Sequence, residues 1–423
     1  MLFIYGSLGL GGIETFFMRI AKERFQLGLT TSILLMGNPD RNNSKLLMEV
    51  EKYAEVIYPN QLFFNILGLA RISPLLLPIK RNRLREVLEK TNQIHVYDGM
   101  HALLGYRLSR VMGKKLPVTI GFYHYIKYLW GGDRVAWHER VNRKFVFDYL
   151  PQQSLLFFSK GNRDLYIKHK KNNFVNANTF RLGVVDKKEV KISGKLNKPL
   201  RIVAIGRLVE FKTYNFYMID VVKSLVVKGY KVQFDIYGDG PLRQQIQGKI
   251  EQLGMAEFVH LNGTLDYSKF DETVMQYDLF IGSGTAIIQS SALGVPSIVG
   301  VENVIEPKSY GYFGNVSEYE YNLKGLNLPL LSVENLIEEL INADEAVRFN
   351  LKQCHLESVE MFTNEACQKS MDDLKNIEMP NHPYLYSMFL YEFSRITDTI
   401  NIKYNKNHPR RTQFEDFRRI SED

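Results

Sequence analysis

The chain has 423 residues, of which 45% are hydrophobic and 24% charged, and its formal net charge is +8. This composition predicts a soluble, folded chain with room for two or three domains. It excludes a membrane-spanning helix, since no stretch approaches ~18 consecutive apolar residues, and no secretory signal pattern opens the chain. The modest positive charge suits an anionic substrate or an anionic membrane surface. Zinc-finger and helix-turn-helix patterns are missing, so no nucleic-acid partner is predicted.

The two cysteines, Cys354 and Cys367, lie late in the chain without C-x-x-C spacing or a histidine pattern. We interpret them as free thiols in a reducing compartment, not as metal ligands or a disulfide framework. The predicted location is therefore the cytoplasm.

The first predicted elements are an apolar strand, a glycine-rich turn and a helix, within MLFIYGSLGLGGIETFFMRI. Gly11 and Gly12 leave backbone N–H groups uncovered at the start of the helix, where the helix dipole favours an anion. The dinucleotide fingerprint fails because its third glycine position is Glu14, and no G-K-S or G-K-T follows as in a triphosphate-binding loop. An apolar stripe and a terminating Gly28 support the helix. The alternative is a tight turn that holds no ligand.

Residues 60–90, NQLFFNILGLARISPLLLPIKRNRLREVLEK, are apolar first and basic afterwards. One interpretation is a segment that contacts the cytoplasmic face of a membrane, with Lys80, Arg81, Arg83 and Arg85 against anionic headgroups. The other is a buried helix pair beneath solvated charges. The sequence leaves both interpretations open.

Strands and helices alternate through the rest of the first half. Strands are predicted at 94–99, 117–123 and 154–159, with helices after the first and the third, and the first of these helices ends at Gly113. This alternation predicts a parallel sheet covered by helices on both faces. Polarity then rises across 185–199 without periodicity, which indicates a linker.

A second alternating unit begins after the linker, with strands in RIVAIGRL, KVQFDIYG, FVHLNG, DLFIG and PSIVGV. We therefore predict an α/β fold of two Rossmann-like, doubly wound lobes that face a central cleft. The expected divisions are a first lobe at 1–184, the linker at 185–199, a second lobe at 200–350 and a helical, basic segment at 351–423.

Two basic residues follow the first strand of the second lobe, where IGRLVEFK places Arg207 and Lys212 just past the strand end. Ligands of open parallel sheets bind outside the carboxyl ends of the strands. An Arg fork and a Lys point charge there suit a diphosphate. The alternative is a pair of solvated surface cations.

A second glycine loop, FIGSGTAIIQ, places Gly284 and Thr285 at the start of a helix, where N–H groups can bind an anion. Gln289, one turn into that helix, is a candidate partner for a sugar hydroxyl. No Asp-x-Asp lies at a strand end, so no metal site is predicted. Helix dipoles and the two cations would hold the diphosphate in place of a metal ion.

Taken in this order, GGIE near the start, GRL followed by Lys, YGDGPLR and ALGVPSI resemble the GT-B fold glycosyltransferases, most closely the retaining family 4, or group 1. The resemblance implies a metal-independent enzyme without a cofactor. Such an enzyme moves a sugar from a nucleotide-diphospho-sugar to a glycan or lipid-linked acceptor with retention, in bacterial polysaccharide or lipopolysaccharide assembly. The loop at Gly11 and Gly12 would lie at the cleft, and Arg207 and Lys212 would hold the donor diphosphate.

One departure from that family concerns a spaced pair of glutamates that contact the sugar and the ribose. The corresponding residues are Ile281 and Gln289. The Gln289 amide can still bond a ribose, but Ile281 offers nothing polar, so the loop at 283–285 would take over the sugar contacts. A non-catalytic protein that binds a nucleotide-sugar is therefore the alternative function.

Similar enzymes often carry a His after a strand of the first lobe, as in PVTIGFYHY. By that resemblance His124 would be the catalytic residue, in contact with the transferring sugar or the acceptor. His101, which follows YDGM at the start of a helix, is a second candidate, and a structural histidine is its alternative.

Overall fold

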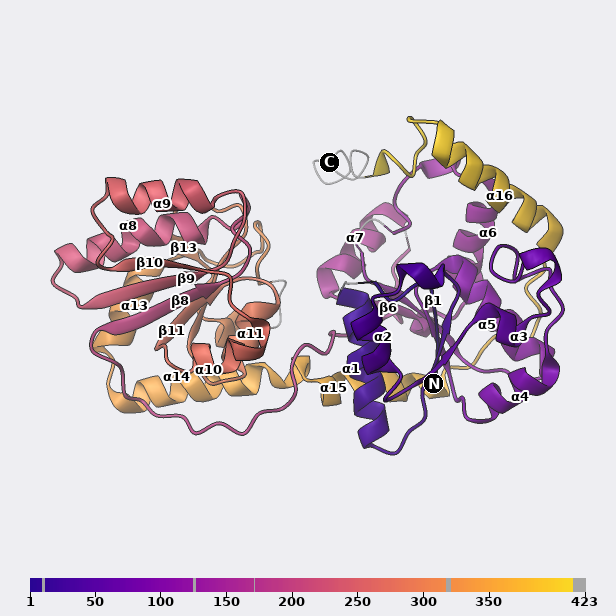
Figure 1. Cartoon of the computed structure of the whole chain (residues 1–423), viewed down its shortest axis with the longest axis horizontal. Helices are drawn as coiled ribbons and strands as arrows, with labels where there is room; N and C mark the ends of the chain where they lie inside the picture. Colours follow the sequence, from indigo (N-terminus) through magenta and orange to yellow (C-terminus); the bar gives the residue numbers. More distant parts are fainter. Residues whose placement is uncertain (10–11, 125–126, 171, 317–320, 414–423) are drawn as a thin grey trace. The chain divides into compact units, whose positions relative to one another are not determined.

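The computed structural model describes residues 1–9, 12–124, 127–170, 172–316 and 321–413. It divides into two compact units (Figure 1). Unit 1 comprises Met1–Leu182 together with Cys367–Asp423, and unit 2 comprises Gly183–Ala366. No helix in the described ranges is both long and apolar enough to cross a membrane.

Unit 1 is built on a seven-stranded parallel sheet with the order β3-β2-β1-β4-β5-β6-β7. Its strands are β1 (Leu2–Tyr5), β2 (Ser32–Leu35), β3 (Glu55–Ile57), β4 (Ile94–Val96), β5 (Val118–Phe122), β6 (Leu155–Phe157) and β7 (Asn178–Thr179). Its helices are α1 (Gly12–Gln26), α2 (Ser44–Val50), α3 (Pro59–Leu62), α4 (Arg81–Glu89), α5 (Gly99–Val111), α6 (Trp137–Lys144), α7 (Lys160–Lys170), α15 (Asn364–Asp373, which starts in unit 2) and α16 (Met388–Tyr404).

The strands of unit 1 are continuous apolar runs because both faces of the sheet are covered. In β1, Leu2 and Ile4 belong to one hydrophobic core, while Phe3 and Tyr5 belong to the core on the opposite face. The α1 helix buries its predicted apolar stripe and ends just before Gly28, whose φ of 70° suits a glycine. The strand–turn–helix prediction for the start of the chain is thereby confirmed.

Unit 2 repeats the architecture with a five-stranded parallel sheet in the order β10-β9-β8-β11-β12. Its strands are β8 (Leu200–Ile205), β9 (Val232–Tyr237), β10 (Val259–Gly263), β11 (Leu279–Gly282) and β12 (Ser297–Val299), with a small hairpin of β13 (Lys308–Ser309) and β14 (Leu331–Ser332). Its helices are α8 (Tyr214–Val227), α9 (Arg243–Gln252), α10 (Phe270–Val274), α11 (Thr285–Ser291), α12 (Phe313–Val316), α13 (Val333–Asn342) and α14 (Glu345–Ser358).

Both sheets reverse their strand order once, and each reversal is a topological switch point. In unit 1 it lies between β1 and β4, and in unit 2 between β8 and β11. Ligands of such sheets bind at the carboxyl ends of the two strands that flank this point. The two predicted Rossmann-like lobes are therefore present, and each has a switch point of its own.

The observed units divide the chain differently from the expected lobes at both ends of unit 2. The expected linker, 185–199, has no regular structure but is bound into unit 2: the Val185 carbonyl accepts from Asn364 N–H at 2.9 Å, and Lys188 Nζ lies 2.5 Å from Asp271 Oδ2. The expected C-terminal segment at 351–423 is split, because α14 packs within unit 2 and residues from 367 onward pack on unit 1.

The return of the C-terminal segment to unit 1 is held by buried polar contacts. Arg24, which is 2% exposed, pairs with Asp372 at 2.8 Å, and the Gln93 amide donates to the Met371 carbonyl at 2.8 Å. A buried guanidinium without its carboxylate would be strongly unfavourable, so these contacts specify where α15 docks.

Candidate functional site

The switch point of unit 2 is flanked by the loops that follow β8 and β11. The loop after β8 carries an exposed Arg207 and a half-buried Lys212. The Lys212 ammonium lies so close to Gly206 that a Cβ there would come within 2.9 Å of Nζ. A side chain at position 206 would therefore displace the Lys212 ammonium from this position.

The YGDG turn after β9 supports that loop from behind. Gly206 N–H donates to the Tyr237 carbonyl at 2.9 Å, and Leu208 N–H donates to the Asp239 carbonyl at 2.9 Å. A Cβ on Gly238 would lie 1.9 Å from the Gly206 oxygen, which backbone atoms cannot accommodate. The glycines of YGDGPLR thus position the loop that carries Arg207.

The two cations of this loop have no counter-ion in contact. Neither Arg207 nor Lys212 pairs with a carboxylate within 4.0 Å among the residues that the structure describes. Burial lowers the pKa of Lys212, Glu302 opposes this shift, and Arg207 adds to it. Two neighbouring positive charges without an ion-pair partner favour a ligand that carries two negative charges.

The loop after β11 provides an open stretch of backbone beside these cations. Gly284 has a φ of 65°, and a Cβ there would meet no atom within 4 Å. Its carbonyl accepts from the Tyr321 hydroxyl at 3.0 Å, and Thr285 begins α11 directly after it. Because α11 has only seven residues, its dipole contributes little, and hydroxyl and N–H groups are the main donors here.

Gln289 is buried in α11 and is only 7% exposed. Its side-chain oxygen has no hydrogen-bond partner within the described part of the chain. Buried polar atoms are almost always paired, so this oxygen marks a place where a ligand or water is expected. Ile281, by contrast, is fully buried in β11 within the core and contributes only packing.

Glu302 is a site residue that the sequence analysis missed. One oxygen of its carboxylate accepts from the Ser283 hydroxyl at 3.2 Å and from the Asn322 amide at 3.1 Å. The following residue, Asn303, donates its N–H to the Phe211 carbonyl at 2.9 Å, which draws this loop toward Lys212. The sequence could have identified Glu302 from its position just past the strand PSIVGV, because the ends of parallel strands share one sheet edge with the glycine loop.

The glycine-rich turn of unit 1 is only partly described. Gly11 lies outside the described residues, and Gly12 begins α1 in an exposed position. The Glu14 carboxylate accepts from the Tyr5 hydroxyl at 3.0 Å, which fixes the first turn of the helix against β1.

His124 lines a pocket of about 430 Å³ that belongs entirely to unit 1. The pocket combines aromatic rings with charged groups, and its lining includes Tyr97, Asp98, Lys127, Trp130, Tyr391 and Arg410. Rings that stack on sugar faces, together with polar groups for hydroxyls, suit an uncharged or weakly charged glycan.

The charged groups of this pocket perturb one another. The Lys127 ammonium lies 3.2 Å from the centre of the Tyr97 ring, and burial lowers the pKa of Lys127 to about 8 although Asp98 opposes the shift. Burial would raise the pKa of Asp98, but His101 and Lys127 hold it well below its usual value. Partial burial, with Lys127 nearby, lowers the pKa of His124, so this imidazole is neutral at pH 7.

His101 does not reach the pocket. It is 5% exposed, and its Nδ1 lies 3.1 Å from Asp98 Oδ2, while Asp98 also caps α5 by accepting from the His101 N–H. The histidine thus stabilises the start of α5, as the structural alternative predicted.

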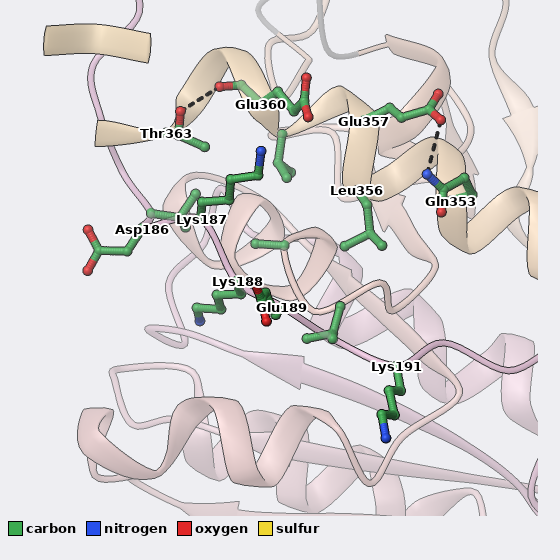
Figure 2. A pocket seen from close by; sticks show the side chains of 14 residues that line it. Asp186, Lys187, Lys188, Glu189, Lys191, Gln353, Leu356, Glu357, Glu360 and Thr363 are labelled. Carbon is green, nitrogen blue, oxygen red and sulfur yellow. Dashed lines mark hydrogen bonds between the residues drawn. The ribbon is translucent and has the colours of Figure 1, made fainter. Parts of the chain in front are cut away.

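A further hollow of unit 2, about 490 Å³, contains none of the predicted site residues. Figure 2 shows that it lies where the segment 185–191 passes the end of α14, with lysines and glutamates on its rim. Gln353 bonds Glu357 at 3.1 Å, and the Thr363 hydroxyl bonds the Glu360 carbonyl at 2.8 Å. Its mixed charges do not select a ligand.

Known proteins resemble this chain in its second unit and in its fold. A family model described as glycosyl transferases group 1 matches residues 185–313. No curated protein matches the sequence. Among solved structures, TarM from S. aureus, in complex with fondaparinux, alpha-GlcNAc-glycerol and UDP, has a TM-score of 0.52 and 11% identity and covers 89% of this chain and 99% of its own.

Two other solved structures resemble the chain to a similar degree. The lipopolysaccharide outer core galactosyltransferase WaaB has a TM-score of 0.50 and 15% identity, with 88% of this chain and 99% of its own covered. The pneumococcal O-GlcNAc transferase GtfA, in complex with UDP and GlcNAc, has a TM-score of 0.50 and 12% identity, with 88% and 98% covered. The fold inferred from the motifs is thereby confirmed: the chain has the GT-B fold, and its residues 185–313 match the model of the group 1 glycosyl transferases.

Proposed function

We propose that this protein transfers a sugar from a nucleotide-diphospho-sugar to a glycan or lipid-linked acceptor, with retention and without a metal ion. The observation that carries the proposal is the pair Arg207 and Lys212, two cations at the switch point of the family-matching unit that contact no carboxylate among the described residues. A diphosphate supplies the two negative charges that this position lacks. The family match supports retention.

The donor diphosphate is proposed to lie across the loops after β8 and β11. Sugar transfer leaves negative charge on the departing nucleoside diphosphate, and fixed cations lower the barrier by stabilising that charge. Arg207 provides a planar fork and Lys212 a partly desolvated point charge, which is stronger than in water. The backbone at Gly284 and Thr285 adds N–H donors.

Glu302 is proposed to supply the carboxylate that Ile281 lacks on the sugar side. It approaches the glycine loop through Ser283 and carries charge near Lys212. A carboxylate beside the donor can accept from sugar hydroxyls or stabilise positive charge that develops on the sugar ring.

The acceptor is proposed to bind in the pocket of unit 1 that His124 lines. A neutral imidazole can accept a hydrogen bond from an acceptor or sugar hydroxyl. Bacterial polysaccharide or lipopolysaccharide assembly in the cytoplasm is the proposed context. The name of WaaB, a lipopolysaccharide galactosyltransferase, and two free cysteines support it.

A non-catalytic nucleotide-sugar-binding protein is the second candidate, favoured by the burial of Ile281 in the core.

Incubation with a panel of nucleotide-sugars separates the transferase from the non-catalytic binding protein. We expect at least one donor to release its nucleoside diphosphate, at a rate unchanged by EDTA. Donors that bind in calorimetry but are never turned over, with any acceptor extract, would establish the second candidate. Activity lost in EDTA and restored by manganese would contradict metal independence.

Arg207→Ala and Lys212→Ala should each weaken binding of the nucleoside diphosphate by roughly tenfold to 100-fold. Each change leaves a phosphate oxygen without a charge-assisted hydrogen bond worth about 1.5–3 kcal/mol. Calorimetry with UDP and other nucleoside diphosphates measures the effect, with Lys223→Ala on the exposed side of α8 as the matched control. Unchanged affinity in both variants would remove this pair from the site.

Gln289→Leu should change stability and donor affinity in opposite directions. In the free protein, leucine removes a buried oxygen that has no partner among the described residues, so the thermal midpoint should rise. The free energy of unfolding should increase by about 1 kcal/mol. In the complex, a ribose hydroxyl would lose its partner, so donor affinity should fall. Gln289→Glu should stay within about tenfold of wild type, since stronger bonds to hydroxyls offset repulsion from the diphosphate. If the Leu variant binds donor as well as wild type, residue 289 does not contact the donor.

Glu302→Gln should separate turnover from binding. The amide keeps the size of the side chain and removes its charge, so nucleoside diphosphate affinity should stay or rise slightly because a repulsive charge is gone. Donor turnover should fall at least tenfold, or about 1.4 kcal/mol in the activation barrier. Glu306→Gln, at an exposed glutamate of the same loop, is the control. Unchanged turnover would show that Glu302 does not act on the sugar.

A further inference from the structure

The outward face of α16 carries a continuous apolar stripe. Phe389, Phe393, Ile396, Ile400 and Tyr404 follow one another at intervals of three and four residues, so they share one side of the helix. Their exposed fractions range from 38% to 74%. Large apolar side chains that are scattered singly on a surface are ordinary, whereas a contiguous row along four helical turns marks an interaction surface.

The opposite side of α16 is fixed to unit 1, which determines the direction of the stripe. The hydroxyl of the fully buried Tyr391 donates to Asn142 Oδ1 at 2.7 Å. His138 N–H donates to the Ser394 hydroxyl at 3.1 Å, and Asp398 Oδ1 lies 3.0 Å from His408 Nε2. These contacts hold the helix in one rotation, so the stripe points away from the unit.

A second apolar segment borders the stripe. Between α3 and α4, the side chains of Phe64, Ile66, Ile72 and Leu76 are between 43% and 51% exposed. Leu75 N–H donates to Glu392 Oε1 at 3.3 Å, and the Arg395 guanidinium bonds the Ile72 carbonyl. The segment 64–76 therefore lies beside α16, and Figure 1 labels α16, α3 and α4 in unit 1. We call these two elements together the apolar surface.

Within α16 and residues 59–85, the exposed charges are positive, and exposed carboxylates resume only at Glu86. Residues 59–85 contain no Asp or Glu. The two carboxylates of α16 are turned inward, since the side chains of Glu392 and Asp398 are 1% and 10% exposed. Exposed cations lie in the same two parts of the chain: Arg71, Arg81, Arg85, Lys403, Lys406 and Arg411. Apolar side chains flanked by cations complement the headgroup layer of an anionic bilayer.

A second copy of the chain fits this surface poorly. In a two-fold dimer the same patch meets itself, which would place the cations of one copy against those of the other. A bilayer with anionic lipids instead pairs each cation with a headgroup and takes the aromatic and aliphatic side chains below the headgroup level.

We propose that the apolar surface binds the surface of an anionic bilayer, with α16 parallel to the membrane plane. The segment at 60–90 already suggested membrane contact from the sequence, and α16 is the new and larger part of the surface. The proposal concerns unit 1 alone and stands whether or not the chain turns over a sugar donor.

Co-sedimentation of the full chain with vesicles tests the proposal. We expect binding to vesicles of phosphatidylglycerol and phosphatidylcholine, weaker binding to phosphatidylcholine alone, and release from the mixed vesicles at high salt. The double variants Phe389→Ser/Phe393→Ser and Lys403→Glu/Lys406→Glu should each reduce binding to the mixed vesicles at least tenfold. Because all four side chains are exposed, thermal midpoints and nucleoside diphosphate affinity should stay unchanged.

The matched control is Phe349→Ser, an exposed phenylalanine on α14 of unit 2, which should bind vesicles as wild type does. The proposal is overturned if wild type does not bind mixed vesicles or if both double variants bind as tightly as wild type. It is also overturned if the wild type is a dimer in size-exclusion chromatography, the variant Phe389→Ser/Phe393→Ser is a monomer, and the two bind vesicles equally. The stripe would then be a contact between copies.

Discussion

The half-buried charge of Lys212, which has no ion-pair partner among the described residues, is the constraint on which the proposed donor site depends. An ammonium that loses part of its hydration without an ion-pair partner costs free energy, and burial lowers its pKa accordingly. The backbone geometry of unit 2 holds the loop that bears Lys212, because Gly238 and Gly240 after β9 pack against the loop after β8 too closely for any side chain. A bound diphosphate would offset this free-energy cost by pairing with the ammonium. Ligand binding should therefore stabilise the loops after β8 and β9.

The departures from the family pattern are connected through the same loops. Position 281 lies in the core between β11 and its neighbours, where a carboxylate would be buried, and isoleucine stands there instead. A carboxylate that meets the glycine loop, Glu302, instead comes from the loop after β12, which a backbone hydrogen bond ties to the loop that bears Lys212. The negative charge of this carboxylate reduces the positive potential of the two cations. It would therefore affect both the affinity for the donor diphosphate and the reaction at the sugar. The unpaired Gln289 oxygen adds an unsatisfied group that a ligand can complete.

In unit 1, α16 joins two proposed roles on opposite sides of one helix. Tyr391, Arg395 and Asp398 line the pocket that contains His124, while Phe389 and Phe393 point outward. The polar contacts that hold α16 in register therefore shape the pocket wall and orient the apolar surface. An acceptor carried on a lipid would be presented close to the surface that we propose binds the bilayer. This arrangement exists only because the C-terminal segment returns to unit 1.

The sequence by itself determined the two alternating units, the extent of α1, the strand ends that carry Arg207 and Lys212, and the glycine loop at Gly284. These features follow from local periodicity, and parallel strands bring their carboxyl ends to one edge whatever the rest of the chain does. Only the tertiary structure decided that Glu302 meets Ser283, that the Gln289 oxygen is left unpaired, and that α16 packs on unit 1. Each of these depends on residues far apart in the chain, whose contacts leave no periodic trace in the sequence, because side-chain packing and hydrogen bonding select them only after the sheets have formed.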